Sequence, residues 1–327
     1  MIRFIAKRLL GWLVMIVVAT NVTYFLASFF LDPRANYAQV RPMPTRAHID
    51  QALAAYHLDP RDPVTSRWWH WASSVVTHFD WGQSPTGGSV NSDVGYRVLI
   101  SGQLVLGGTL LSVLIGVALG VYTASRQYRV TDRLSQGVSI VLLNIPTVVA
   151  ALALVYGAVW INQHVGHRLF YVSDSSSPDV SGVFPSILDR LNHLVLPTIS
   201  LTLLGYVTYH LTQRSLLLDN INADFVRTAR ATGLTRAQAV RRHALRASLI
   251  PTATTVAFTV PSVFTGAIIT ESIFGWHGMG EYFTLTITRN DVNGVVAVAA
   301  FGAVMTAIGA VLADIATVLL DPRVRMS

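Results

Sequence analysis

Long apolar stretches without a charged side chain are the feature that most constrains the fold of this chain. A helix needs about 20 apolar residues to cross roughly 30 Å of hydrocarbon. Six stretches reach that length: Leu9–Leu31, Val98–Ser125, Leu134–His167, Leu191–Gln213, Ala247–Thr270 and Val292–Ala313. Leu134–His167 is longer than one span and must include some loop. The pattern predicts an all-α membrane protein with six transmembrane helices.

The composition agrees with a bilayer rather than an aqueous environment. Only 13% of the 327 residues are charged, about half the share in soluble domains, and the mean hydropathy is +0.48. A soluble enzyme, a disordered chain and a coiled coil all fit this composition poorly. Basic residues precede Leu9–Leu31, as in a signal peptide. Its apolar stretch is too long for that, and no small-residue cleavage site follows, so a retained span is predicted.

The distribution of basic residues predicts the orientation of the spans. Cytoplasmic loops of membrane proteins carry an excess of Lys and Arg. The alternate set of segments that includes both termini holds 15 basic residues, and the other set holds 9 over longer loops. Both termini are therefore predicted to be cytoplasmic. The net charge of +7 follows from this topology and needs no nucleic-acid partner.

Two of the segments predicted on the extracytoplasmic side have a readable pattern. The longer, residues 32–96, exceeds an ordinary loop and should be partly folded. Within it, Thr45–His57 is predicted to form a short helix with Thr45 as the N-cap. We interpret the tryptophans that follow as a girdle at the membrane interface, with docking of a substrate or partner as the alternative. They are Trp68, Trp69, Trp71 and Trp81. Residues 166–190 form the second outer loop.

Sequence motifs of enzymes and redox proteins are missing. Without cysteine the chain has no disulfides, thiolate metal sites or cysteine nucleophiles. A Walker A loop needs Gly-x-x-x-x-Gly-Lys-Ser/Thr, but the single lysine, Lys7, has no glycine before it. Neither a His-Glu-x-x-His zinc helix nor a Gly-x-Ser-x-Gly turn occurs. We therefore predict no catalytic, cofactor-binding or metal-ligating residue, and any ATP that drives this protein must be hydrolysed on another chain.

The most informative segment is Asn222–Pro251, on the predicted cytoplasmic side. Ala223–Thr232 is compatible with a short helix, and Gly233 should follow its end in a left-handed conformation. Thr235 can cap a second helix running to about Ser248. Six arginines lie along the segment: Arg227, Arg230, Arg236, Arg241, Arg242 and Arg246. The pattern predicts a helix–turn–helix elbow.

Residue types alone leave three interpretations of this elbow open. It could be an ordinary positive-inside loop, or a basic amphipathic helix held at the surface by anionic lipid. It could also be an element that docks onto a partner protein.

The spacing within the elbow resembles the EAA loop of ABC-importer permeases. A small residue and a glycine stand four positions apart (Ala229 and Gly233), and a proline follows 18 residues after the glycine (Pro251). Arg227–Leu234 is similar to the variant of this motif in peptide permeases. Further segments that resemble this family are Asn144–Pro146, Leu196–Pro197, Glu271–Phe274, Gly278–Gly280 and Asp321–Arg325. The chain thus resembles, over effectively its whole length, the OppB/DppB-type permease subunits of bacterial dipeptide and oligopeptide importers.

The resemblance implies a type I ABC importer permease fold in the bacterial plasma membrane. It also implies a division of the chain. Residues 1–31 would be the cytoplasmic N-terminus and first span, 32–96 the extracytoplasmic segment, 97–320 the permease domain with its coupling loop at 222–251, and 321–327 the cytoplasmic tail.

The same resemblance implies a function and partners. The chain would form half of a pathway for dipeptides or oligopeptides and bind no cofactor. Its partners would be a second, homologous permease subunit, two ATP-binding domains that use ATP and Mg, an extracytoplasmic peptide-binding protein and the lipid bilayer. Import of nickel or another small solute is the alternative within this class. A non-transporting membrane anchor or regulator is the alternative outside it.

Candidate site residues follow from the resemblance. The residues expected to couple the elbow to the ATPase are Phe225, Arg227, Thr228, Ala229, Arg230, Ala231, Gly233 and Leu234. Among them, Phe225 and Leu234 are expected as apolar anchors, Arg227 and Arg230 as polar contacts, and the three small residues as points of close approach. Candidates for lining the pathway are Thr255, Thr259, Ser262 and Thr265. Packing between helices is the alternative role for these hydroxyl residues.

Overall fold

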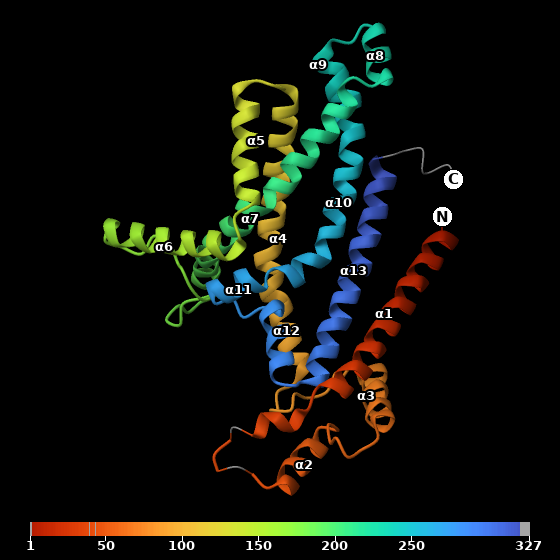
Figure 1. Cartoon of the computed structure of the whole chain (residues 1–327), viewed down its shortest axis with the longest axis vertical. Coiled ribbons are helices and arrows are strands. Elements are labelled where there is room, and N and C mark those ends of the chain that lie inside the picture. Colours follow the sequence, from red (N-terminus) through yellow and green to blue (C-terminus); the bar gives the residue numbers. More distant parts are fainter. Residues whose placement is uncertain (1, 39, 43, 321–327) are drawn as a thin grey trace. The chain divides into compact units, whose positions relative to one another are not determined.

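The computed structural model describes residues 2–38, 40–42 and 44–320, with the side chains of 2–7, 258, 260–266, 319 and 320 left undescribed. The described part is built from helices and contains no strand beyond an isolated bridge between Gln83 and Ser89. Figure 1 shows the helices in chain order. The all-α prediction is confirmed. The predicted cytoplasmic tail, 321–327, lies outside the described residues.

Five helices in the described residues are long and apolar enough to cross a membrane. Their apolar parts are Arg8–Phe30, Val90–Ser125, Thr147–Val165, Val183–Ile221 and Val292–Val318. They belong to α1 (Ile2–Phe30), α4 (Val90–Ser125), α6 (Thr147–Val165), α7 (Val183–Ile221) and α13 (Val292–Leu320). The sixth predicted span, Ala247–Thr270, falls on α10 (Leu245–Gly266) and the start of α11 (Ile268–Phe274) and is not among these five.

The third predicted span is broken in the structure. Its sequence, Leu134–His167, divides into α5 (Val130–Leu143) and α6, which begins at Thr147. Pro146 disfavours a helical backbone at the residue before it, and Asn144 ends α5 as its C-cap. With 14 residues, α5 is too short to cross the hydrocarbon. The loop expected within Leu134–His167 is this break, and of the two helices only α6 is among the five long apolar ones.

The chain separates into two compact units. The first comprises Met1–Ser101 and His277–Ala307, and the second comprises Gly102–Trp276 and Ile308–Ser327. Since α4 and α13 each contain a unit boundary, the chain passes between the units within continuous helices.

The first unit has its own apolar core. Its elements are α1, the short helix η1 (Pro33–Tyr37), α2 (Arg46–Ala55), α3 (Val64–His78), α12 (Met279–Thr288) and the adjoining parts of α4 and α13. The core includes Tyr24, Leu53 and Val296, all nearly inaccessible to solvent. The Thr45 hydroxyl accepts a hydrogen bond from the His48 backbone N–H at the start of α2. The predicted short helix and its N-cap are confirmed, with an end at Ala55.

Three of the four tryptophans predicted to form an interface girdle pack against other side chains of the first unit. Trp71 is buried in the core and its ring stacks on Tyr24, with centroids 4.8 Å apart. Trp68 is half-buried and donates from Nε1 to the Asn21 side chain at 2.6 Å. Trp81 packs edge-on against Trp71. Folding of residues 32–96 onto α1 supplies these partners. Trp69 remains 65% exposed.

The second unit is organised by close packing of α4 on α7. A Cβ built at Gly116 would lie 2.5 Å from the Tyr206 carbonyl oxygen, and one at Gly120 would lie 2.8 Å from the His210 carbonyl oxygen. These glycines, four residues apart, let two backbones approach as in Gly-x-x-x-Gly helix pairs. The spacing was readable in the sequence but was not interpreted there. It fixes the C-terminal half of α7, which leads into the candidate site.

Candidate functional site

The elbow begins with α8 (Asp224–Ala231), which ends in a tight hydrogen-bonded turn. The Gly233 N–H donates to the Arg230 carbonyl at 3.0 Å, and the Leu234 N–H donates to the Ala229 carbonyl at 3.3 Å. This pair of bonds is the Schellman pattern of helix ends. Gly233 has φ +98°, a conformation that L side chains rarely adopt. The predicted turn at Gly233 is confirmed.

The second arm of the elbow is continuous with the following long helix. The Thr235 side chain and Gln238 form a reciprocal capping box at the start of α9 (Arg236–Ala239). The helix then passes through a π-helical turn, η2 (Val240–Ala244), directly into α10. The Thr235 cap is confirmed, but the predicted end near Ser248 was wrong because α10 carries the helix on to Gly266. Figure 1 shows α8 and α9 at the end of α7 and α10.

The elbow packs on the ends of α4 and α7 through a small apolar cluster. We call it the elbow core, and it consists of Ala124, Leu217, Val226, Ala229, Ala239 and Ala244. Leu234 packs against it and is half-buried. Four alanines allow α8, α9 and η2 to lie close to the supporting helices, because larger side chains would hold them apart. The elbow is thus a packed element rather than a free loop.

The elbow core divides the predicted coupling residues into two groups. Ala229 and Leu234 face the elbow's own core, so they hold it together. Exposed on the other side are Phe225, Arg227, Thr228, Arg230, Ala231 and Gly233. Phe225 is 45% exposed, a large area for an aromatic ring. This second group can contact a partner without disturbing the packing of the elbow.

A shielded ion pair ties α7 to α5 just behind the elbow. Arg214 donates to the Asp132 carboxylate through Nε at 2.7 Å and through a terminal nitrogen at 2.8 Å. The Tyr128 backbone N–H and the Gln136 amide donate to the same carboxylate, each at 2.9 Å. The hydrogen bonds from Arg214 lower the pKa of Asp132 below its usual value, in spite of its burial.

Two further polar contacts fasten α7 to its neighbours. The His210 ring lies between the Thr123 hydroxyl on α4, at 3.1 Å, and the Ser139 hydroxyl on α5, at 2.7 Å. Gln213 donates to the Ser248 hydroxyl at 2.9 Å and accepts from the Thr252 hydroxyl at 2.6 Å, both on α10. His210 and Gln213 are both fully buried. One stretch of α7 is thereby fixed to α4, α5 and α10.

These supporting residues were missed in the sequence. Asp132 and Arg214 entered only as charges in the count that set the topology, and the pairing joins residues 82 positions apart. For His210 a signal existed, since an ionisable residue inside a predicted span calls for a partner or a function. Histidine is neutral in such a stretch, so His210 does not interrupt Leu191–Gln213 and its partners are not visible in the sequence.

The candidate pathway residues lie in or near α10. The Thr255 side chain is exposed and its hydroxyl donates to the Pro251 carbonyl at 3.0 Å. The Thr259 hydroxyl lies 3.0 Å from the Tyr209 hydroxyl on α7, a contact between helices. The side chains of Ser262 and Thr265 lie outside the described residues.

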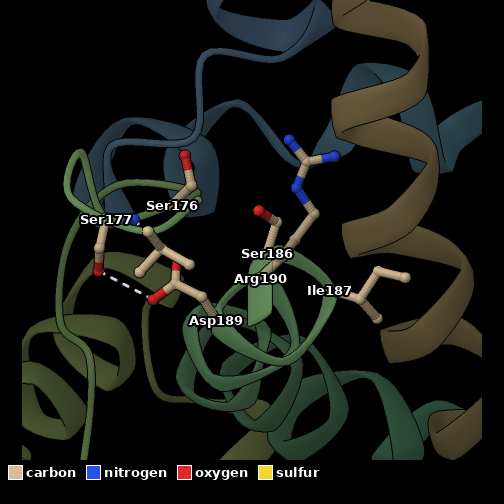
Figure 2. A pocket seen from close by; sticks show the side chains of 7 residues that line it. Ser176, Ser177, Ser186, Ile187, Asp189 and Arg190 are labelled. Carbon is tan, nitrogen blue, oxygen red and sulfur yellow. Dashed lines mark hydrogen bonds between the residues drawn. The ribbon is translucent and has the colours of Figure 1, made fainter. Parts of the chain in front are cut away.

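The second unit also contains a pocket of about 310 Å³ where the loop before α7 meets the first turns of that helix (Figure 2). Its lining residues are Ser176, Ser177, Val180, Ser186, Ile187, Asp189 and Arg190. In Figure 2 the Asp189 carboxylate points to Ser177, and the Arg190 guanidinium is directed away from it.

Two lining residues, Ser177 and Asp189, form a Ser–His–Asp set with His193, and the geometry of this set is structural. Ser177 donates to Asp189 from its backbone N–H at 2.7 Å and from its hydroxyl at 2.8 Å. The His193 Nε2 lies 3.2 Å from that hydroxyl, and its Nδ1 faces the carbonyls of Ser173 and Asp174. A hydrolase triad needs the carboxylate on Nδ1, whereas Asp189 lies on the Nε2 side. These contacts fasten the loop before α7 to that helix.

Comparison with known families agrees with this architecture. Residues 116–326 match the family described as binding-protein-dependent transport system inner membrane component. The match covers both the elbow and the helices that support it, and the chain belongs to this family. It is therefore an integral, multi-pass membrane component of a transport system, in keeping with its five apolar helices.

Individual relatives of the chain within this family are permease proteins of peptide transport systems. The chain is 39% identical, over the full length of both proteins, to the oligopeptide transport system permease protein OppB of Mycobacterium bovis and of Mycobacterium tuberculosis. It is 29% identical to the dipeptide transport system permease protein DppB of Bacillus subtilis, over 100% of this chain and 99% of the relative. The resemblance seen in the sequence motifs is confirmed.

Proposed function

We propose that this chain is the permease subunit of an ATP-driven importer of dipeptides or oligopeptides. The observation that carries the proposal is the elbow, a rigidly packed helical projection with an exposed face, within a chain that matches oligopeptide permeases along its entire length. A projection built in this way can transmit force, because its residues are divided between internal packing and an outer surface.

The proposal includes six spans with both termini in the cytoplasm. The five apolar helices support it, and α10 supplies the sixth span despite its prolines and threonines, since bundles tolerate such residues where neighbouring helices satisfy the backbone. The 15-to-9 division of basic residues supports the orientation. In this organisation 32–96 is extracytoplasmic, 97–320 is the permease domain with the coupling loop at 222–251, and 321–327 is a cytoplasmic tail.

The family of the chain and its missing Walker A loop together support a set of partners. Its sequence has no Walker A loop, so two ATP-binding domains on other chains hydrolyse ATP with Mg. The exposed face of the elbow docks into them, with Phe225 as the apolar anchor and Arg227 and Arg230 as polar contacts at the rim. A second, homologous permease subunit completes the pathway, and an extracytoplasmic peptide-binding protein delivers the substrate.

The pathway itself is proposed to run beside α10. An exposed hydroxyl such as that of Thr255 can hydrogen-bond a peptide without introducing charge. Thr259, Ser262 and Thr265 follow at helical spacing and are the further candidates. Single cysteines at these four positions should react with water-soluble reagents in intact membranes if they line the pathway.

The test combines purification and transport. The tagged chain should copurify with an ATPase in mild detergent, and the complex in proteoliposomes should take up peptides when ATP is supplied. Phe225→Ala should reduce uptake and ATPase stimulation together while leaving membrane insertion intact; Asp219→Asn, an exposed change on α7, is the control. Uptake of nickel instead of peptides would refute the proposal that peptides are the substrate. Absence of any ATPase under several detergents would refute the importer and favour a membrane anchor or regulator.

A further inference from the structure

The helix α3 has more apolar surface than its own unit covers. Trp68, Trp71 and Val75 face the core of the first unit. Beside this inward face, Trp69 is 65% exposed and Val76 is 84% exposed. The two residues are seven positions apart and therefore lie on one side of the helix. Phe79, the C-cap of α3, is 70% exposed.

The contacts of α3 with α1 fix its depth relative to the span. Trp68 bonds to Asn21 and stacks on Phe25, and Trp71 stacks on Tyr24. Asn21 and Tyr24 precede Phe30, the last residue of the apolar helix, by roughly 14 and 9 Å of helical rise. Figure 1 shows α3 against this end of α1. The helix α3 thus lies alongside the last turns of α1, at the depth of Asn21 and Tyr24, and not in the water beyond Phe30.

The exposed residues of α3 continue an exposed apolar surface of the span α1. On the same end of α1, Val22 and Leu26 are each more than half exposed, and Phe29 and Phe30 are 72% and 81% exposed. Around α3 the exposed surface changes from apolar to polar: Ser66 and Thr77 are exposed and lie about 60–100° around the helix axis from Trp69 and Val76. A helix with an apolar side toward the span and an adjoining polar side suits the membrane interface.

We propose that α3 is an interfacial helix that inserts Trp69, Val76 and Phe79 among the phospholipids at the boundary between headgroups and acyl chains. Tryptophan prefers this level because its ring is apolar and its indole N–H can reach polar groups. The occupant of the surface is lipid, since the surface joins that of a membrane-spanning helix at the same depth. The inference concerns how the extracytoplasmic segment is anchored and holds whatever the transported solute is.

The natural absence of cysteine makes a direct test possible. Single variants Trp69→Cys, Val76→Cys, Ser66→Cys and Thr77→Cys are labelled with an environment-sensitive fluorophore in the purified full-length chain. The labelled proteins are then reconstituted with any copurifying subunits into phosphatidylethanolamine–phosphatidylglycerol vesicles. A phospholipid carrying a spin label near its headgroup quenches from within the bilayer, and iodide quenches from water.

We expect the lipid quencher to remove most of the fluorescence at positions 69 and 76, severalfold more than at 66 and 77, and iodide to show the opposite order. Equal quenching by iodide at all four positions would overturn the proposal. Protection of 69 and 76 from both quenchers would also overturn it, because a protein would then cover the surface. If Trp69→Cys fails to accumulate, the adjacent pair Val76→Cys and Thr77→Cys decides the question alone.

Discussion

Replacing Asp132 by asparagine should destabilise the second unit strongly for so small a change. Asparagine keeps one oxygen that can accept from the Tyr128 N–H. Its amide nitrogen replaces the oxygen that accepts from Gln136 and from the Arg214 Nε, so the substitution removes the charge and one acceptor. The carboxylate side chain is 1% exposed and Arg214 is 15% exposed. The variant therefore leaves a guanidinium, largely shielded from water, without its counterion.

The magnitude follows from this shielding. Removing one partner of a buried ion pair costs about 3–5 kcal/mol, because the remaining charge is uncompensated. Partial exposure of Arg214 lets water stabilise that charge, which reduces the expected loss to about 2–4 kcal/mol. The double variant Asp132→Leu with Arg214→Met removes both charges. The free energy of unfolding of this double variant should fall by less than the sum of the losses in the two single variants, and the difference should be at least about 1 kcal/mol.

Unfolding by sodium dodecyl sulfate in mixed micelles, followed by tryptophan fluorescence, measures these differences for the full-length chain. Asp219→Asn is the matched control, since Asp219 is exposed on the same helix and its change should cost no more than about 0.5 kcal/mol. A loss below about 1 kcal/mol for Asp132→Asn would place the pair among exposed ion pairs and refute the argument from shielding.

The ion pair also predicts a dependence on pH. Because the pKa of Asp132 is lowered in the folded chain, its stabilisation is complete above the pKa of an unfolded carboxyl, about 3.9. It is lost as the pH falls through the lower folded value. The difference between wild type and Asp132→Asn should therefore stay constant from about pH 5 to 8 and shrink only below about pH 4. A difference that fell between pH 8 and 6 would contradict this assignment.

Three further predictions concern single positions. Gly233→Val should strain the backbone of the elbow by about 1–2 kcal/mol, without a steric clash because no atom lies within 4 Å of a Cβ at this position. Peptide uptake should fall while membrane insertion stays normal. Unchanged uptake rates would refute a role of Gly233 in coupling. Gly116→Leu should cost about 1–3 kcal/mol or more through overpacking against α7, seen as reduced folded protein, whereas Gly102→Ala, in open space on α4, should accumulate normally. Asp291→Asn should retain the acceptor for the Gly294 N–H. Because burial raises the pKa of Asp291, the wild type should lose stability relative to this variant as the pH rises through the unfolded and then the folded pKa of Asp291. Unfolding of both proteins at a series of pH values measures this difference.

The sequence was most informative where the signal is local. The apolar stretches, the Thr45 and Thr235 caps and the turn at Gly233 depend on residues within a few positions of one another. The described residues contain long apolar helices for five of the six stretches, both caps and the turn. The break before Thr147 also has a local cause in Pro146. Hydropathy alone does not show the position of this break, because the residues around it carry no charge.

What could not be predicted depends on contacts between distant segments. The tryptophans after residue 67 were assigned to the membrane interface by residue type, yet Trp71 found its partner in Tyr24, 47 positions earlier, which no periodicity shows. Likewise the small residues of the elbow gave no indication of which side they face. Only the packing of α8 on Leu217 shows that Ala229 is internal and that Phe225 is not.

The division of the elbow into an inner and an outer side bears on how force would pass through it. The elbow core contacts α7 at Leu217, one turn from the residues that fix α7 to its neighbours: Arg214 to α5 and Gln213 to α10. A displacement of α8 is then shared by several helices at once, because close-packed interiors and bonded polar pairs deform little. Residues that make the elbow stiff, such as Ala229, need no contact with a partner to be essential. Substituting Ala229 should therefore weaken coupling through the elbow core, whereas substituting Phe225 should weaken it by loss of binding.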